Sequence, residues 1–524
     1  MRSIVLSGFM ATGKSTVGPA LAARLGVPFV DTDEAIEAAA GRRIRDLWCD
    51  EGEAAFRARE AALVERLLAD GMRRVVAFGG GTVTVPRARR LATERAIVVT
   101  LTASPETIVA RTPDIAARPN LAVGGDPVAR AAELLAARAE AYAECHLALS
   151  SEGLEPDAMV EAIVALAERD PILMPLGSRS YTLDVCDGDP SRLTDAIARC
   201  APSSVVLVTD SNVQRARGEA IERALRPLAF EGTRVTLPPG ERHKTLASVG
   251  TIWEAALGAG VDRDALVVAA GGGVVGDLAG FAAACLLRGV RFVQVPTTLL
   301  AMVDASVGGK TGFDHATGKN LIGAFHQPSA VVADLVHLDT LPRRELASGL
   351  AEIAKIALAT DEALLEELER HAPALSRGDH AALGPVVRAA IEAKIRVVRD
   401  DEREAGRRIL LNLGHTVGHT LEAHGGYARW LHGEAVALGT LAELEAGVAL
   451  GWTPPALVDR TRALFAALAL PARVDRDELG ASLPLVASDK KRSRGALRMP
   501  IVTAAGHARL ERVTVDALRR ALGA

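Results

Sequence analysis

The sequence predicts an α/β protein in two successive sheet-containing parts, followed by a mostly α-helical segment. Residues 1 to about 168 alternate short β-like runs with alanine-rich amphipathic stretches, and the same alternation returns between residues 177 and 341. Such alternation is typical of a parallel sheet with flanking helices. From Pro342 to the C-terminus β-like runs nearly vanish and a helical period dominates.

The first part contains four short runs rich in β-branched and apolar residues, separated by helical stretches. The last helical stretch runs into DPILMPLGSRS, residues 170–180, where two prolines and a glycine interrupt the pattern. We therefore predict a domain at 1–168 and a joint at 169–176. The four predicted strands are SIVLS (3–7), VPFVD (27–31), RVVAFGG (74–80) and AIVVTL (96–101).

The second part contains five such runs before Pro342. One long apolar stretch, from Ala265 to Leu287, contains five glycines and Asp277. This composition favours a buried strand with a glycine turn over a membrane span. We predict an α/β domain at 177–341 and a helical domain at 342–524. The five predicted strands are VVLVTD (205–210), RVTLP (234–238), ALVVAAGGG (265–273), RFVQVP (291–296) and AVVADL (330–335).

Composition limits the possible functions. The chain has 524 residues, enough for roughly three domains of ordinary size. A net charge of −4 without a long basic run gives a nucleic-acid partner no electrostatic support. Five well-separated cysteines without a C-x-x-C pair indicate reduced thiols, and the N-terminus reaches Lys14 too early for a signal peptide. We expect a cytoplasmic protein with no membrane or nucleic-acid partner.

A phosphate-binding loop is predicted at GFMATGKS, residues 8–15, between a strand and a helical stretch. Backbone N–H groups of a G-x-x-x-x-G-K-[ST] loop wrap the β-phosphate, Lys14 neutralises phosphate charge and Ser15 reaches Mg²⁺. The alternative is an ordinary glycine turn, which the strand–loop–helix context disfavours. The predicted ATP-binding residues of this loop are Gly8, Ala11, Thr12, Gly13, Lys14, Ser15 and Thr16.

Short motifs downstream indicate the phosphate acceptor. Each is common alone, but in this order they resemble shikimate kinase along residues 1 to about 168. Ala11 and Asn120 depart from the usual family residues without removing a charged group. Gluconate or nucleoside monophosphate kinases are the alternative, and a pair of arginines together with DTD argues against them. The motifs are DTD (31–33), FR (56–57), GGG (79–81), RPNL (118–121) and RAEAY (138–142).

The resemblance implies that Lys14 and Asp33 are catalytic residues. It also implies that Asp33 binds the hydroxyls of shikimate and that Arg57 and Arg138 hold the carboxylate of shikimate. A small anionic acid requires paired guanidiniums, and phosphoryl transfer requires cations around the γ-phosphate. The other implied positions are Asp31 in the shell of the Mg²⁺ that enters with ATP, Arg118 on a lid that touches ATP, and Gly79, Gly80 and Gly81 lining the acceptor pocket.

A glycine-rich turn and many polar residues mark the second part. GGGVVGD, residues 271–277, fits G-x-G-x-x-G after a predicted strand, but no acidic residue follows about 20 positions later, so an ordinary turn is the alternative. Asp304, Lys310, Lys319 and Asn320 alternate with glycines in segments that we expect to be loops. This arrangement suits a phosphorylated ligand better than a core.

The order of the motifs from GGGVVGD onward resembles 3-dehydroquinate synthase over about residues 177–524. The whole chain therefore resembles a fused shikimate kinase and 3-dehydroquinate synthase. The further motifs are VPTT (295–298), DASVGGKT (304–311), GKNLIGAF (318–325), ASGLAEIAK (347–355), GHTVGHTLE (414–422) and HGE (432–434).

The resemblance implies an NAD-dependent conversion of 3-deoxy-arabino-heptulosonate 7-phosphate to 3-dehydroquinate, with loss of phosphate and no net redox change. The implied catalytic residues are Asp304, Lys310, Lys355 and His419. The implied substrate contacts are Arg288, Lys310, Asn320, Lys355, Lys394, Arg408, Asn412, His419 and either Lys490 or Lys491. The implied NAD contacts are Asp210, Asn212, Glu241, Lys244, Gly272, Gly273, Val274, Asp277, Thr297, Thr298, Lys310, Lys319 and Thr340.

Four of the twelve histidines of the chain lie in one short stretch. From spacing alone, His415 and His419 would pair as metal ligands on one face of a helix. The resemblance instead implies Glu352, His415 and His432 as ligands of Zn²⁺ or Co²⁺, with His419 beside the substrate. A catalytic zinc takes nitrogen and oxygen ligands and keeps one position open. We expect His424 to be structural or solvated.

Two other enzyme classes compete for the second part. A metal-dependent polyol dehydrogenase would release NADH and would need no lysine-rich phosphate site. A different sugar-phosphate cyclase would give no functional reason for its fusion to a shikimate kinase. We therefore expect small-molecule substrates (shikimate, ATP and the heptulosonate phosphate), and the resemblance leaves open a homodimer formed through the synthase half.

Overall fold

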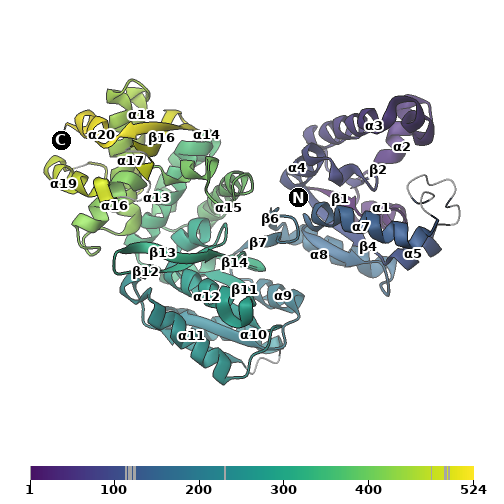
Figure 1. The fold of residues 1–524 in the computed structure, drawn as a ribbon, viewed down its shortest axis with the longest axis horizontal. Helices are drawn as coiled ribbons and strands as arrows, with labels where there is room; N and C mark the ends of the chain where they lie inside the picture. Colours follow the sequence, from purple (N-terminus) through teal and green to yellow (C-terminus); the bar gives the residue numbers. More distant parts are fainter. Residues whose placement is uncertain are drawn as a thin grey trace. The chain divides into compact units, whose positions relative to one another are not determined.

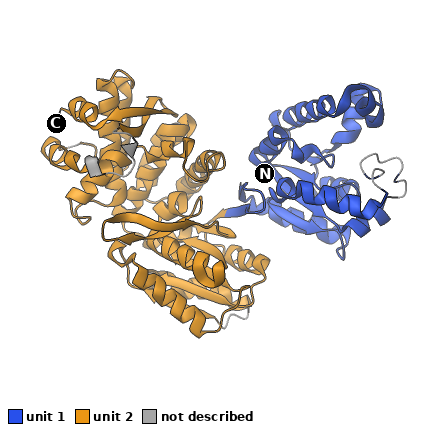
Figure 2. Cartoon of the chain, viewed as in Figure 1, with its two compact units in different colours: residues 1–183 blue, residues 184–524 orange. Residues whose placement is uncertain are grey.

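The computed structural model describes residues 2–112, 115, 121, 125–228, 232–473, 475–488, 492–493 and 496–523. The chain divides into two compact units, Met1–Leu183 and Asp184–Ala524 (Figure 2). Within the described part of the chain, no helix has both the length and the apolar character needed to cross a membrane.

Unit 1 is built on a five-stranded parallel sheet in the order β2-β3-β1-β4-β5 (Figure 1). All four predicted strands are present. The fifth strand, β5, was not predicted, because its apolar run LAL is only three residues long and none of its four residues is buried. The strands are β1 (Ser3–Ser7), β2 (Phe29–Asp31), β3 (Val75–Ala77), β4 (Ala96–Thr102) and β5 (Leu147–Ser150), and the helices are α1 (Lys14–Leu25), α2 (Thr32–Ala40), α3 (Ile44–Ala69), α4 (Pro86–Arg95), α5 (Pro105–Ala110), α7 (Pro127–Ala143) and α8 (Pro156–Arg169).

Both faces of this sheet are covered, because side chains alternate along each strand. Ile4 and Leu6 of β1 pack in one cluster with Leu21 of α1 and Ile163 of α8. Val5, which lies between them in the sequence, packs in the opposite cluster with residues of α3 and α4. The central strand β1 is therefore buried on both sides, and the loop that follows it starts from a rigid support.

A second sheet lies mainly in unit 2, with helices on both faces. Its strands from β14 to β9 pair in parallel, whereas β6 and β7, at the other end of the order, pair antiparallel and were not predicted. β6 and the first half of β7 precede Asp184. All five predicted strands are present. The stretch from Ala265 to Leu287 forms the predicted buried strand and glycine turn, and a helix, Gly273–Cys285, follows. The sheet order is β6-β7-β14-β11-β10-β8-β9. The elements are β6 (Ile172–Met174), β7 (Tyr181–Cys186), α9 (Ser191–Cys200), β8 (Val205–Asp210), α10 (Ser211–Leu225), β9 (Thr233–Leu237), α11 (Leu246–Gly258), β10 (Leu266–Gly271), α12 (Gly273–Cys285), β11 (Arg291–Pro296) and β14 (Ala330–Asp334).

A β-hairpin replaces the loops predicted between residues 304 and 325. Lys310 lies in β12 (Lys310–His315), and Lys319 and Asn320 lie in β13 (Gly318–Phe325), so the loop prediction is wrong for these residues. Asp304 lies in a π-helical turn, Ala301–Ala305. The glycines misled the prediction: a Cβ at Gly312 would overlap the backbone of the opposite strand, so this glycine permits close strand pairing.

The C-terminal part of unit 2 is mostly helical, as predicted, but it also contains a small antiparallel sheet (Figure 1). The sheet was missed because most side chains of β17 are polar or exposed. The elements are α13 (Arg343–Thr360), α14 (Glu362–Ser376), α15 (His380–Val398), α16 (His415–His424), α17 (His432–Ala449), α18 (Pro455–Ala467), α19 (Arg476–Ser482), β15 (Arg492–Ser493), β16 (Ala496–Ala504), β17 (His507–Thr514) and α20 (Val515–Leu522).

Helix α17 packs with its backbone against the backbones of its neighbours, because glycines lie at the points of contact. A Cβ at Gly439 would overlap the carbonyl oxygen of Gly414 and the amide of Gly418 in α16. A Cβ at Gly433 would overlap the backbone of Ser348 in α13. These glycines therefore set the spacing between three helices, α13, α16 and α17.

We expect Gly439→Ala to destabilise unit 2 by about 1–3 kcal/mol, the usual range for overpacking a close contact. The matched control is Gly250→Ala in α11, where an added Cβ would meet no atom within 4 Å. That change should be neutral or stabilising by about 0.4–1 kcal/mol, since alanine restricts the unfolded chain. Calorimetric unfolding of both variants checks this. Equal shifts would show that the α16–α17 contact is not close.

Candidate active sites

The first site begins at the loop between β1 and α1. Gly8 has a φ of 133°, Gly13 a φ of 96° and Ala11 a φ of 60°, so the backbone repeatedly enters the left-handed region. A Cβ at Gly8 would also overlap the carbonyl oxygen of Leu101. No side chain caps the N-terminus of α1. Its first amides are therefore directed at the space above the loop, which favours an anion.

Lys14 lies across this loop. Its Nζ donates to the carbonyl oxygens of Gly8, at 2.8 Å, and Phe9, at 2.7 Å. Burial lowers the pKa of Lys14 to about 8, although Asp33 and Asp31 oppose the shift. A phosphate at the loop would supply the missing counter-charge. Beside Lys14 is a cavity of about 640 Å³, lined by Ala11, Gly13, Ser15, Thr16 and Arg111, the last of which the sequence analysis missed.

The predicted acceptor residues converge on the glycine triplet after β3. A Cβ at Gly79 would overlap Oδ1 of Asp33, and a Cβ at Gly81 would overlap the guanidinium of Arg57. Between them, the carbonyl oxygen of Gly80 accepts a hydrogen bond of 3.1 Å from Nη1 of Arg138. The triplet therefore lets a carboxylate and two guanidiniums lie around one small space.

Supporting residues hold these arginines, and the sequence analysis missed them. Nη1 of Arg57 donates to Glu60, which is fully buried and also accepts from the hydroxyl of Thr82 at 2.6 Å. The guanidinium of Arg57 also lies over the ring of Trp48, 5.1 Å from its centroid. The i,i+3 spacing of Arg57 and Glu60 was the available signal. Tyr142, four residues after Arg138, donates its hydroxyl proton to the carbonyl oxygen of Gly80.

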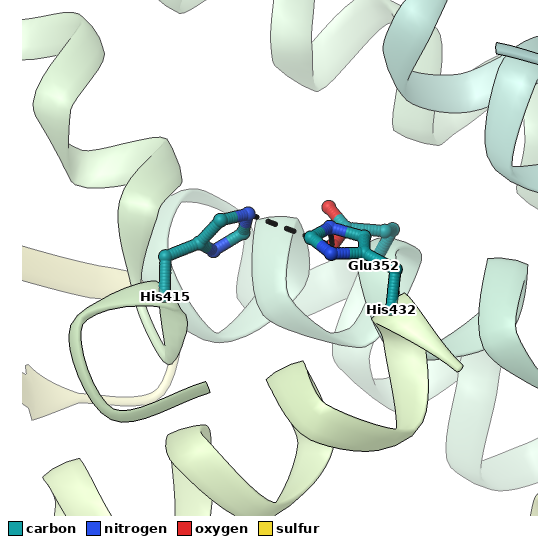
Figure 3. A group of neighbouring side chains, drawn as sticks. All are labelled: Glu352, His415 and His432. Atoms are coloured by element: carbon teal, nitrogen blue, oxygen red, sulfur yellow. Dashed lines mark ion pairs between the residues drawn. The ribbon is translucent and has the colours of Figure 1, made fainter. Parts of the chain in front are cut away.

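The second site brings together Glu352 of α13, His415 at the start of α16 and His432 at the start of α17 (Figure 3). Oε1 of Glu352 lies 3.3 Å from Nε2 of His432 and 3.9 Å from Nε2 of His415. One ligand atom from each residue lies within 4.8 Å of the others. A second group with the same property contains His419, Glu422 and His432, so both sets share His432.

Backbone contacts orient His415. Its Nδ1 lies 3.2 Å from the carbonyl oxygen of Leu413, which leaves Nε2 facing Glu352. Glu443 of α17 accepts from the amides of Gly414 at 2.8 Å and Val417 at 3.2 Å, so a side chain of another helix caps α16. This cap fixes the first turn of α16, where His415 lies.

The electrostatics of this cluster favour a cation. Glu352 is fully buried; its Oε2 accepts from Lys355, while Oε1 has no hydrogen-bond partner among the described residues. Burial opposes the charge of His432, but the carboxylates of Glu352 and Glu422 outweigh burial and raise the pKa of His432 to about 10. A carboxylate oxygen that accepts no hydrogen bond from the described residues and faces two imidazoles is a donor set that fits Zn²⁺ or Co²⁺.

Buried lysines border the cluster. Nζ of Lys394 donates to Oδ1 and to the carbonyl oxygen of Asp304, both at 2.5 Å. Burial lowers the pKa of Lys394 to about 8. Burial would raise the pKa of Asp304, but Lys394 and Lys355 hold it below its usual range. Two buried lysines therefore lie next to the Glu352 cluster, each paired with a carboxylate, and they could also contact an anionic ligand.

Glu404 joins two predicted substrate residues and was missed. Its carboxylate pairs with Lys310 and accepts a hydrogen bond of 2.7 Å from Asn412. Arg408, nearby in the sequence, donates to the carbonyl oxygens of Glu402 and Gly308. Glu404 has a φ of 59° in an irregular segment. Such a segment has no periodicity, so the sequence carried no signal for this residue.

The residues predicted to contact NAD fall into two groups. Lys244 pairs with Asp277 at 2.6 Å and donates to Asn320, and Lys319 lies 3.7 Å from Glu241. The described contacts of other positions lie elsewhere: Asp210 caps α10 and Thr340 donates to the carbonyl oxygen of His337. At the start of helix α12 lie Gly272, Gly273 and Val274, helix α10 starts near Asn212, and strand β11 is followed by Thr297 and Thr298.

Among the other predicted positions, Arg288 ends the turn after α12. Outside the described residues lie Arg118, Asn120, Lys490 and Lys491.

These arrangements define two classes of site. A phosphate-binding loop facing a carboxylate and two guanidiniums is the site of a small-molecule kinase of the P-loop class. The second site combines a glycine turn after a parallel strand, a buried glutamate that faces two histidines, and buried lysines. This is the site of a metal-dependent α/β enzyme acting on an anionic ligand.

Comparison with family models assigns both parts. Residues 10–168 match shikimate kinase, residues 234–348 match the 3-dehydroquinate synthase N-terminal region, and residues 349–492 match its C-terminal region. The chain belongs to the 3-dehydroquinate synthase family and carries a shikimate kinase domain ahead of the synthase. It is a fused bifunctional enzyme of the shikimate pathway, as the order of its motifs predicted.

Individual relatives support this assignment. The 3-dehydroquinate synthase of Halorhodospira halophila is 46% identical over 335 residues, which cover 64% of this chain and 93% of that protein. That of Gloeobacter violaceus is 45% identical over 358 residues, covering 68% and 98%. A solved structure of 2-epi-5-epi-valiolone synthase from Streptomyces hygroscopicus, with NAD⁺ and Zn²⁺ bound, is 30% identical with a TM-score of 0.59, covering 65% and 95%.

Proposed function

We propose that the loop of unit 1 binds ATP with Mg²⁺ and that Asp33, Arg57 and Arg138 bind shikimate. The observation that carries this assignment is the convergence of these three side chains on Gly79–Gly81. Lys14 lies at the loop, where it would neutralise the transferred phosphoryl group, and Ser15 and Asp31 would hold Mg²⁺. The remaining ATP contacts that we propose are Gly8, Ala11, Thr12, Gly13, Thr16 and Arg118.

Asp33 and the arginines have different roles in this proposal. The two guanidiniums, each held by neighbouring groups, would fix the carboxylate of the acceptor and so orient its hydroxyls. The carboxylate of Asp33 would accept a hydrogen bond from the hydroxyl that attacks the γ-phosphate. Asp33 raises the pKa of Lys14, which supports an acceptor site next to the phosphate site.

Lys14→Ala removes the cation at the phosphates. We expect the kinase rate to fall on the order of a thousandfold or more, since such cations stabilise the transition state by several kcal/mol. The synthase rate of the same purified chain should not change. Following ADP formation and phosphate release in separate assays measures both activities. Loss of both would contradict two independent sites.

We propose that Glu352, His415 and His432 hold Zn²⁺ or Co²⁺ in the synthase half, and that NAD⁺ binds along the carboxyl edge of its sheet. The Streptomyces structure with NAD⁺ and Zn²⁺ bound supports this, as does Oε1 of Glu352, which faces both imidazoles and accepts no hydrogen bond from the described residues. The buried, unpartnered hydroxyls of Thr209 and Thr297 among the described residues also fit a polar ligand at that edge. The metal supplies Lewis acidity to substrate hydroxyls, and NAD⁺ supplies a reversible hydride acceptor.

The side chains of this half bind the substrate and exclude water from it. Lys394, Lys355 and Arg408 are buried, so their charges are strong toward the phosphate and carboxylate of a heptulosonate phosphate. Asp304, held by Lys394, would stay ionised and fix the nicotinamide side of the site. The other proposed substrate contacts are Arg288, Lys310, Asn320, Asn412, His419 and Lys490, and the proposed NAD contacts are Asp210, Asn212, Glu241, Lys244, Gly272, Gly273, Val274, Asp277, Thr297, Thr298, Lys310, Lys319 and Thr340.

Metal content decides between the two overlapping ligand sets. Glu352→Gln and His432→Ala should lose the bound metal and the synthase activity, because each removes a ligand, while the kinase stays active. His419→Ala should keep one equivalent of metal and turn over slowly. Metal analysis of the purified variants measures this. Retention in Glu352→Gln together with loss in His419→Ala would favour the set that contains His419 and Glu422.

Chelation should distinguish the two metals of the enzyme. Mg²⁺ arrives with ATP, whereas the Glu352 cluster should hold a tightly bound ion. Removing divalent ions should stop both activities. Adding Mg²⁺ should restore only the kinase, and adding Zn²⁺ or Co²⁺ should restore the synthase. Recovery of the synthase with Mg²⁺ alone would argue against a site with imidazole ligands.

We further propose domain limits at 1–168, 177–341 and 342–524 with a linker at 169–176, a cytoplasmic location, and a homodimer formed through the synthase half. None of the five separated cysteines forms a disulfide, which suits a reducing compartment.

Sedimentation of the intact chain measures the oligomeric state. A monomer at micromolar concentration would exclude the dimer.

A further inference from the structure

A buried carboxylate outside the proposed ligand set contacts two functional side chains at once. Glu422 of α16 is only 3% exposed. Its Oε2 lies 3.4 Å from Nδ1 of His432, and its Oε1 accepts a hydrogen bond of 3.2 Å from Nζ of Lys319. The two contacts come from separate elements, because His432 begins α17 and Lys319 lies in the hairpin strand β13.

We propose that Glu422 is a positioning residue for the metal ligand His432, and that Lys319 holds Glu422 in the orientation this role requires. The inference rests on the proposed ligand set of Glu352, His415 and His432. The two nitrogens of His432 have different neighbours: Nε2 faces Glu352, at 3.3 Å, and Nδ1 faces Glu422. The ring can bind a metal through Nε2 only while the proton stays on Nδ1.

A carboxylate at Nδ1 has two effects on such a ligand. It accepts the Nδ1 proton, which fixes the tautomer and the ring orientation, and it increases the basicity of the nitrogen that binds the metal. His415 is oriented by the neutral carbonyl oxygen of Leu413, which carries no charge to add to the effect. His432 is half-buried, more exposed than His415, so its ring depends more on a side-chain partner.

Lys319 limits the freedom of Glu422 from the opposite side. Its ammonium also lies 3.7 Å from Glu241 and 4.6 Å from the ring centroid of Tyr427. These contacts place a cation against Oε1 and leave Oε2 for His432. Without Lys319 the carboxylate would lose the contact at Oε1, so we expect Lys319 to affect the metal site through Glu422.

The affinity of the chain for Zn²⁺, measured by competition with a chelator and without NAD⁺, tests the proposal apart from activity. Glu422→Leu keeps the volume but removes the acceptor, and it should weaken binding about 10–100-fold. Glu422→Gln keeps an acceptor without the charge, so its affinity should fall between those of Glu422→Leu and the native chain. The matched control is Glu478→Leu, another buried glutamate, whose partners are Trp430 and Arg429. It should bind Zn²⁺ like the native chain.

Lys319→Gln should weaken binding a few-fold in the native background and have no further effect in Glu422→Leu. Additive losses would overturn the proposed link between Lys319 and Glu422. Native affinity in Glu422→Leu would overturn the positioning role, provided that Glu352→Gln loses the metal. If Glu352→Gln retains it, the proposed ligand set itself is wrong.

The absorption spectrum of the Co²⁺-loaded chain separates positioning from direct ligation. At saturating Co²⁺, Glu422→Gln should keep the band positions and intensities of the native protein, because the ligands are unchanged. A changed coordination pattern would make Glu422 a ligand and overturn the positioning role.

Discussion

The synthase half depends on one constraint, the burial of the Glu352 carboxylate. A buried, unpaired carboxylate costs several kcal/mol, so the surrounding structure has to supply positive charge and donors. Lys355, one turn further along α13, supplies an ammonium to one oxygen, and the imidazoles of His415 and His432 face the other. Burial would raise the pKa of Glu352, but Lys355 and His432 outweigh burial and hold that pKa below its usual range. The charge therefore persists where a metal would need it.

The same constraint explains the packing of the helices that carry these side chains. Imidazoles from α16 and α17 reach a carboxylate on α13 only if the three helices approach closely. Gly433 lies against Ser348 of α13, and Gly439 lies against Gly414 and the first turn of α16. Larger residues at these positions would separate the helices. Glycine, normally unfavourable inside a helix, is here the residue that allows the cluster to form.

Sequence reasoning predicted the features that follow from periodicity and motifs, and missed those that depend on tertiary contacts. The nine β-like runs became strands because each is short, apolar and bounded by turn residues. The hairpin of β12 and β13 was missed, because the glycines that allow its strands to approach resemble loop glycines. Glu404 and Glu422 lie near predicted residues, but neither role follows from a spacing rule. Their partners, Lys310 and Lys319, lie about a hundred residues away.

Each active site is assembled within one unit. The proposed ATP and acceptor residues that the structure describes all precede Leu183, and the proposed synthase residues all follow Asp184. No described side chain is therefore shared between the two reactions. The reactions themselves are not consecutive steps of the pathway, so the product of one is not the substrate of the other. Fusion in one chain then fixes the ratio of the two enzymes without requiring transfer of an intermediate between them.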